Sequence, residues 1–208
     1  MRFIVTGTGH SGTGHTSAVF SRLGLACGHE SVYVRFKYPD GMAEVQPWED
    51  WRGDSSALAA PFLSDFDGLI FHQVRHPLQF MWSMTFSKGL FAPNQPWGKL
   101  LLRHCPSAAE FQEGPDPTLA WAEEFWIDWN AQIRSHHPDL TWKIEDFGSS
   151  QVEDALVLLG ESRSREEITE ALDVSKRKNH HTPEGIDRPE VPFSPKLKEA
   201  AEGYGYTI

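Results

Sequence analysis

The stretch that decides the fold is MRFIVTGTGHSGTGHT, residues 1–16. A short apolar strand over residues 2–6 runs into a loop rich in glycine, with Gly7, Gly9, Gly12 and Gly14. Glycines let a backbone turn sharply and bring several N–H groups to one anion, and a helix that begins at residues 11–13 directs its positive end to the same point. The pattern therefore predicts a strand, a phosphate-binding loop and a helix.

Two templates fit this loop. Residues 9–16 match the nucleotide P-loop pattern GxxxxGK[ST], except that His15 stands where the lysine contacts the β- and γ-phosphates of a nucleoside triphosphate. The second template is the 5′-phosphosulfate loop of sulfotransferases, in which a basic residue followed by Ser-Gly-Thr opens the helix, here residues 10–13. The loop alone leaves both templates open.

A second segment favours the sulfotransferase template. Residues 68–84 read GLIFHQVRHPLQFMWSM, in which an apolar run over 69–74 is typical of a buried parallel strand and Pro77 begins a helix. Arg75 and Ser83 resemble the sulfotransferase motif that binds the 3′-phosphate of 3′-phosphoadenosine 5′-phosphosulfate (PAPS), because they stand eight residues apart at a strand end and in the next helix. Arginine supplies a permanent bidentate charge and serine a short neutral donor.

Two further stretches extend the resemblance. Residues 26–30, ACGHE, are similar to the acceptor-side segment of tyrosylprotein-type and carbohydrate-type sulfotransferases, and residues 141–147, TWKIEDF, resemble a late strand of the family that ends in Glu-Asp. The likeness covers residues 1 to about 150, and the chain is identified as a small member of the sulfotransferase family. This resemblance implies transfer of a sulfuryl group from PAPS to a hydroxyl or amine of a small-molecule or glycan acceptor, with adenosine 3′,5′-bisphosphate as the product.

The resemblance also implies roles for individual residues. His10 stands where the family usually has lysine or arginine beside the transferring group, and a neighbouring anion would favour its protonated form. Glu30 is the preferred general base, with His29 second. Arg177 and Lys178 belong to a basic C-terminal loop that either closes over the nucleotide or is an exposed charge run. The residues expected to hold the 5′-phosphosulfate are Ser11, Gly12, Thr13, Gly14, His15 and Thr16.

Two other functions stay open. A P-loop kinase or nucleotide hydrolase would need Mg²⁺, a P-loop lysine and an aspartate at a strand end, whereas the strand over 69–74 is followed by Arg75 and contains no acid. A catalytically degenerate nucleotide-binding protein is the third possibility, because His10 replaces the usual cation.

Size and charge restrict the partners. At 208 residues and 39% hydrophobic content, the chain is long enough for one well-buried domain, which we expect to span residues 1–208. A net charge of −10 argues against a general binder of nucleic acid or of anionic membranes. A site for PAPS must then be a local basic pocket, for which His10, His15, Arg75 and residues 176–178 are the candidates.

The cysteines and histidines do not predict a metal site. Cys27 and Cys105 are far apart in sequence and lack a metal or redox spacing, which indicates reduced thiols in a cytoplasmic protein. The histidine pairs at 136–137 and 180–181 are adjacent residues, which rarely chelate one ion. The apolar run near the N-terminus is too short for a signal peptide or a membrane span.

The remaining pattern predicts an α/β, three-layer P-loop-like fold with a central parallel sheet flanked by helices and the ligand at the carboxyl ends of the strands. Residues 31–65 read as irregular structure with one short helix over 55–63, residues 89–117 as a long loop over the site that would contact the acceptor, and residues 175–195 as a polar C-terminal loop. Helices are expected over 13–23, 77–88, 118–136, 149–159, 164–172 and 196–203, and a further strand over 141–144.

Overall fold

The computed structural model describes residues 1–34, 44–86, 95–110, 118–175 and 192–208. Within them, five parallel strands form one sheet in the order β2-β5-β1-β6-β7. The strands of this sheet are β1 (Phe3–Thr6), β2 (Cys27–His29), β5 (Gly53–Ser55), β6 (Leu69–Val74) and β7 (Leu140–Lys143). A separate antiparallel pair joins β3 (Tyr33–Val34) to β4 (Glu44–Val45).

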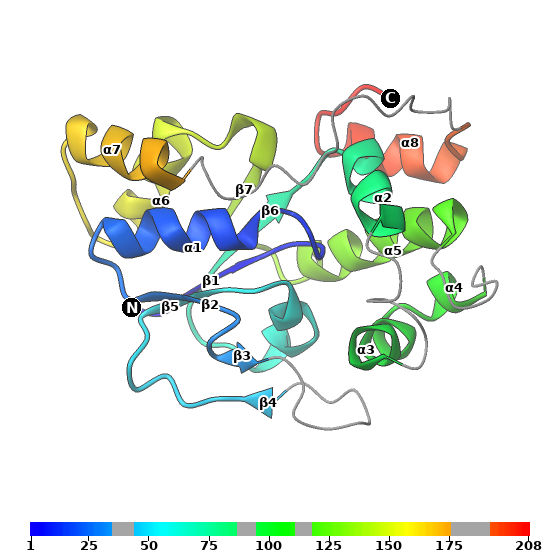
Figure 1. Ribbon diagram of the computed structural model, residues 1–208, viewed down its shortest axis with the longest axis horizontal. Coiled ribbons are helices and arrows are strands. Elements are labelled where there is room, and N and C mark those ends of the chain that lie inside the picture. Colours follow the sequence, from blue (N-terminus) through cyan, green and yellow to red (C-terminus); the bar gives the residue numbers. More distant parts are fainter. Residues whose placement is uncertain (35–43, 87–94, 111–117, 176–191) are drawn as a thin grey trace.

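Helices cover both faces of the sheet, so that the fold has three layers, as predicted (Figure 1). Side chains alternate along β1: Phe3 and Val5 pack on one face with α1, α6 and α7, whereas Ile4 packs on the other with α2, α5 and α8. The α-helices are α1 (Thr13–Arg22), α2 (Pro77–Phe86), α3 (Pro96–His104), α4 (Pro106–Ala109), α5 (Leu119–Arg134), α6 (Ser149–Leu158), α7 (Arg165–Ser175) and α8 (Pro195–Glu202). Two 3₁₀ helices, η1 (Ala57–Asp65) and η2 (Ile144–Asp146), complete the regular structure.

Many of the predicted elements are confirmed. The strand over 69–74 has the predicted bounds, and α5 departs from the predicted helix over 118–136 by at most two residues at either end. The capping box at the start of α7 forms in both directions: the Glu167 carboxylate accepts from the Ser164 N–H at 2.7 Å, and the Ser164 hydroxyl accepts from the Glu167 N–H at 3.2 Å.

The prediction of irregular structure over residues 31–65 is wrong for residues 53–55. These residues form β5, which lies inside the sheet between β2 and β1. The sequence Gly53-Asp54-Ser55 lacks the large apolar residues typical of a buried strand. The strand packs so closely against β1 that position 53 requires a glycine, since a Cβ on Gly53 would lie 2.1 Å from Cζ of Phe3. The helix expected over 55–63 is the 3₁₀ helix η1, capped by the Ser56 hydroxyl, which accepts from the Leu58 N–H at 3.1 Å.

The long loop expected over 89–117 is also wrong in its described part, since residues 95–110 contain α3 and α4. Pro96 and Pro106 each stand in the first turn of a helix, where a proline removes no helical hydrogen bond and its fixed φ suits the helix. These prolines therefore mark helix starts and do not indicate a loop. Residues 89–94, 111–117 and 176–191 lie outside the described residues.

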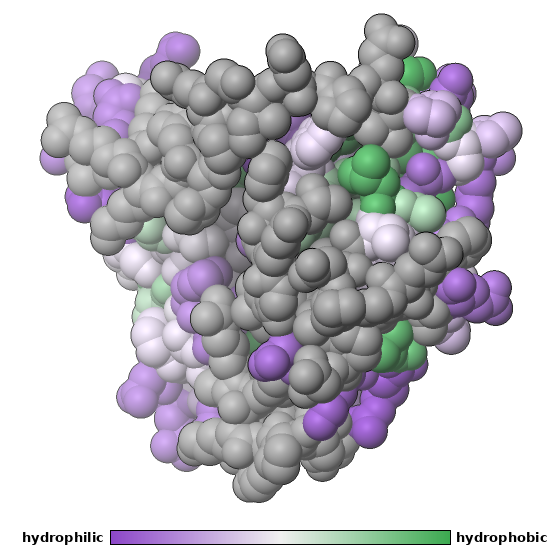
Figure 2. Space-filling model, turned by 45° about the vertical axis from the view of Figure 1, so that its right-hand side comes forward, coloured by the Kyte–Doolittle hydropathy of each residue, from purple (hydrophilic) through white to green (hydrophobic). Residues whose placement is uncertain are grey.

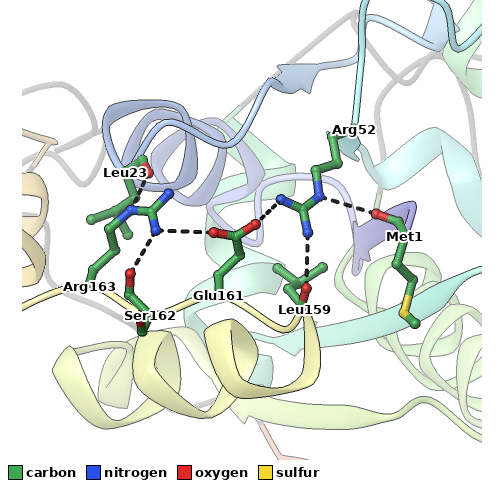
Figure 3. Close-up of polar contacts among 7 residues, drawn as sticks. All are labelled: Met1, Leu23, Arg52, Leu159, Glu161, Ser162 and Arg163. Atoms are coloured by element: carbon green, nitrogen blue, oxygen red, sulfur yellow. Dashed lines mark hydrogen bonds and ion pairs between the residues drawn. The ribbon is translucent and has the colours of Figure 1, made fainter.

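A polar cluster ties the turn between α6 and α7 to the amino edge of the sheet (Figure 3). Glu161 forms ion pairs with Arg52 and Arg163, the latter at 3.1 Å. Arg52 also donates to the carbonyls of Met1 and Leu159 at 3.3 and 2.9 Å, and Arg163 donates to the carbonyl of Leu23 at 2.8 Å. Both arginines therefore stabilise the edge opposite the glycine-rich loop.

Candidate functional site

The loop between β1 and α1 has the backbone geometry that its glycines predict. A Cβ on Gly7 would lie 2.1 Å from the carbonyl oxygen of Gln73, so that no larger residue fits there without a shift of the backbone. Gly12 is the N-cap of α1 and has a φ of 92°, in the left-handed region that glycine adopts without strain. His10, with a φ of 64°, adopts the same region although it carries a side chain.

Gln73 anchors this loop to the neighbouring strand. Its side chain is fully buried, and Nε2 donates to the carbonyl of Ser11 at 2.5 Å. Its Oε1 accepts from the Thr16 hydroxyl and, at 3.1 Å, from Nε1 of Trp142. The sequence analysis did not assign a role to Gln73, although a glutamine within an apolar strand is itself a signal, because a buried amide requires partners.

Two tryptophans of α5 donate hydrogen bonds to the backbone of the glycine-rich loop and of the residue after β6. Trp129 Nε1 donates to the carbonyl of Gly7 at 3.1 Å, and Trp126 Nε1 donates to the carbonyl of Arg75 at 2.9 Å. Both indoles are fully buried in the core. One helix therefore contacts both the glycine-rich loop and the arginine at the end of β6.

Buried hydroxyl groups along the loop fit an anionic ligand. The Oγ atoms of Thr6, Thr8 and Ser11 are buried, and none of the three accepts or donates a hydrogen bond within the described part of the chain. A buried hydroxyl without a partner costs about 1–3 kcal/mol, and an acceptor bound at the loop would satisfy the hydroxyls of Thr8 and Ser11. An oxyanion held at the N-terminus of α1 has the required chemistry.

Arg75, Ser83 and His10 come together although more than sixty residues separate the loop from the other two. Arg75 Nη1 donates to the carbonyl of His10 at 2.7 Å, and Ser83 Oγ lies 2.9 Å from His10 Nδ1. Burial lowers the pKa of Arg75, while Glu145 and Tyr206 raise it. The guanidinium remains cationic, since an arginine does not lose its proton in proteins.

The acceptor-side residues lie at the end of β2, beside the start of α1. His29 is exposed, and its Nε2 lies 3.3 Å from Oγ1 of Thr13. Glu30 follows in a left-handed conformation with a φ of 51°, and its N–H donates to the carbonyl of Ser55 at 3.4 Å.

A buried carboxylate, which the sequence analysis missed, holds the turn after Glu30. Asp54 accepts hydrogen bonds at 3.0–3.2 Å from the N–H groups of the next three residues, Ser31, Val32 and Tyr33. Burial raises the pKa of Asp54, and these three hydrogen bonds act against that rise. Asp54 thereby sets the path of the chain beyond the candidate bases.

The other predicted ligands of the 5′-phosphosulfate occupy the first turn of α1, as Thr13, Gly14, His15 and Thr16. The His15 ring packs edge-on against Phe147, with 5.7 Å between ring centroids, and the Thr16 side chain is buried against Gln73. The remaining predicted residues, Arg177 and Lys178, lie outside the described residues.

The described residues contain no group of three or more His, Cys, Asp or Glu side chains that could hold a metal ion. Cys27 and Cys105 are buried free thiols, and burial raises the pKa of both. No described helix is both long enough and apolar enough to cross a lipid bilayer.

Comparison with known proteins finds a solved structure with a similar fold. No protein-family model matches the sequence, and no curated protein matches it. Among solved structures, a mouse sulfotransferase crystallised with PAP is similar, with a TM-score of 0.47 and 14% sequence identity. The alignment covers 84% of this chain, which spans 63% of the length of the mouse protein. A match at this level does not identify a reaction, and a functional assignment depends on the residues of the site.

Proposed function

We propose that this chain is a sulfotransferase that moves a sulfuryl group from PAPS to a hydroxyl or amine of a small-molecule or glycan acceptor. One observation carries the proposal: Arg75 and Ser83, spaced as in a 3′-phosphate motif, both contact His10 of the glycine-rich loop. A donor with phosphates at its 5′ and 3′ positions requires two such sites, and the fold places the two motifs next to each other.

The residues of the loop would hold the 5′-phosphosulfate. Their backbone N–H groups lie at the N-terminus of α1, and the buried hydroxyls of Thr8 and Ser11 supply donors that have no other partner in the described chain. When bound, PAPS supplies an activated sulfuryl group whose bond to the bridging phosphate oxygen breaks as the bond to the acceptor forms. His10, protonated beside this anion, would offset the charge that develops on that oxygen.

The acceptor must lose a proton, and the turn at the end of β2 offers two bases. His29 contacts Thr13 at the start of α1, whereas the Glu30 backbone is engaged with β5. This contact brings the His29 ring to the start of α1, so that His29 is a candidate for the group that removes the proton, beside Glu30, which the resemblance prefers. Asp54 would act indirectly, by holding the backbone of the turn.

Calorimetry with adenosine 3′,5′-bisphosphate and AMP tests the nucleotide site. The bisphosphate should bind more tightly by about 2–4 kcal/mol, because its 3′-phosphate adds charge-assisted hydrogen bonds to Arg75 and Ser83. Mg²⁺ should have no effect. Arg75→Ala should abolish most of this preference, whereas Arg22→Ala, which removes an exposed arginine of α1, should leave it unchanged.

Equal affinity for the two nucleotides would refute the proposal. Tighter binding of Mg-ATP than of the bisphosphate would instead favour a P-loop kinase or nucleotide hydrolase.

A further inference from the structure

The backbone around Arg75 is held by hydrogen bonds on both sides. The carbonyl of Val74 accepts from the Tyr206 hydroxyl at 3.2 Å, and the N–H of His76 donates to Oε1 of Glu145 at 2.8 Å. The carbonyl of Arg75 itself accepts from Trp126. Three consecutive residues at the end of β6 are thus tied to side chains from three distant segments.

Tyr206 and Glu145 act as one unit. The Tyr206 hydroxyl has a single proton, which is shared between Oε2 of Glu145, at 2.8 Å, and the Val74 carbonyl, at 3.2 Å. The two oxygens of the Glu145 carboxylate thus link Tyr206 to the His76 backbone. Burial and the neighbouring carboxylate raise the pKa of Tyr206, which keeps the phenol protonated as a donor. The His76 ring packs edge-on against the Tyr206 ring, with 5.1 Å between centroids.

The last residues of the chain are themselves fixed at this end of the sheet. Lys143 Nζ donates to the carbonyl of Gly205 at 2.8 Å and lies 4.9 Å from the centroid of the Tyr206 ring. The Tyr206 side chain is buried. In Figure 1 the C-terminal segment after α8 lies beside the connection from β6 to α2, which is where Arg75 stands.

We infer that Tyr206 and Glu145 are positioning residues that aim Arg75 at the 3′-phosphate and thereby set the preference for a 3′-phosphorylated nucleotide. The inference rests on the proposed function. A guanidinium binds a phosphate through a planar fork, so that a small rotation of its backbone costs much of the interaction. The peptide groups on either side of Arg75 determine that orientation.

The test compares Tyr206→Phe with Tyr204→Phe. Each variant loses one hydroxyl near the C-terminus, but the Tyr204 hydroxyl donates to the carbonyl of Asn130 in α5. The measured quantity is the ratio of the dissociation constants of AMP and of adenosine 3′,5′-bisphosphate. Tyr206→Phe should lower this ratio about tenfold, as expected for a lost hydrogen bond to a charged group, and Tyr204→Phe should not change it.

A double variant shows whether Tyr206 acts through Arg75. In an Arg75→Ala background, Tyr206→Phe should leave the ratio unchanged, because the residue that it positions is gone. A merely structural role for Tyr206 would weaken both nucleotides equally and leave the ratio intact in either background. That result would overturn the inference.

Amide hydrogen exchange tests the same contacts without a nucleotide. The His76 N–H should be protected in the wild type, exchange about tenfold faster in Tyr206→Phe and stay protected in Tyr204→Phe. Rapid exchange of the His76 N–H in the wild type would refute its hydrogen bond to Glu145, independently of any result on nucleotide binding. A protected His76 together with equal affinity for AMP and the bisphosphate would refute the proposed function and leave the contacts around Arg75 confirmed.

Discussion

At the scale of single residues, a buried amide organises the candidate site. Gln73 contacts the loop through Ser11, the first helix through Thr16 and strand β7 through Trp142. Each contact satisfies a polar group that burial would otherwise leave without a partner. The glycine-rich loop therefore owes its conformation to a residue of the neighbouring strand as well as to its own glycines.

Replacing Gln73 with methionine should destabilise the protein by about 2–4 kcal/mol, because methionine has a similar shape but strands several buried polar groups at once. Urea unfolding measures the change. Gln151→Met is the matched control: its half-buried Oε1 accepts one hydrogen bond, from the Gly148 N–H at 3.1 Å, and its loss should cost less than about 1 kcal/mol. Equal losses in the two variants would show that Gln73 does not organise the loop.

At the scale of elements, α5 connects the glycine-rich loop to the end of β6. Its start is capped by Thr118, whose hydroxyl accepts from the Trp121 N–H at 3.1 Å, and its buried face packs beneath the sheet. From that face, Trp126 and Trp129 donate to the backbone at the ends of β6 and β1. Movement of this helix would therefore be transmitted to both segments.

Trp129→Phe should lower the affinity for adenosine 3′,5′-bisphosphate several-fold, since the carbonyl of Gly7 loses its donor and the loop is less well fixed. Trp121→Phe removes the same atoms from a buried position at the other end of the helix and is the control. Both variants should lose about 1–3 kcal/mol of stability through the smaller ring. Titration calorimetry would contradict the prediction if both variants bound the nucleotide equally well.

At the scale of the whole molecule, burial controls how stability depends on pH. His72 lies on β6, is fully buried, and its Nε2 lies 2.9 Å from Oδ1 of Asn130. Burial lowers the pKa of His72 to about 4. Between pH 4 and about 6.5 the unfolded chain binds this proton and the folded chain does not, so stability is lost as the pH falls.

The contribution of His72 to this loss should reach at most about 3 kcal/mol, measured by urea unfolding at pH values from 8 to 4.5. Asp54, whose pKa is raised by burial, contributes with the opposite sign, so that the comparison with His72→Gln isolates the histidine. The variant should show a flatter profile below pH 6.5. An identical profile in both proteins would exclude His72 as the group responsible.

The described surface carries both hydrophilic and apolar residues. Figure 2 shows hydrophilic residues around the rim of one face, with apolar residues in small separate groups. The large apolar side chains that are exposed in the described chain are Met1, Val45, Val157 and Leu158.

Elements that depend on residues close together in the chain can be predicted from the sequence. The strand over 69–74, the helix α5 and the capping box of α7 follow from runs, periods and pairs of residues that lie close together in the chain. The glycine-rich loop is predicted in part, since its glycines indicate where the backbone turns, whereas its anchoring by Gln73 depends on the neighbouring strand.

Other features depend on the tertiary structure and could not be predicted from the sequence. They are the position of β5, the roles of Gln73 and Asp54, and the contacts of Tyr206 around Arg75. Each depends on partners from distant parts of the chain: Gln73 contacts Ser11 across 62 residues, and Tyr206 contacts Val74 across 132. Parallel strands pair only through such long connections, and a buried polar side chain is defined by the groups that the rest of the fold brings to it. No local pattern contains that information.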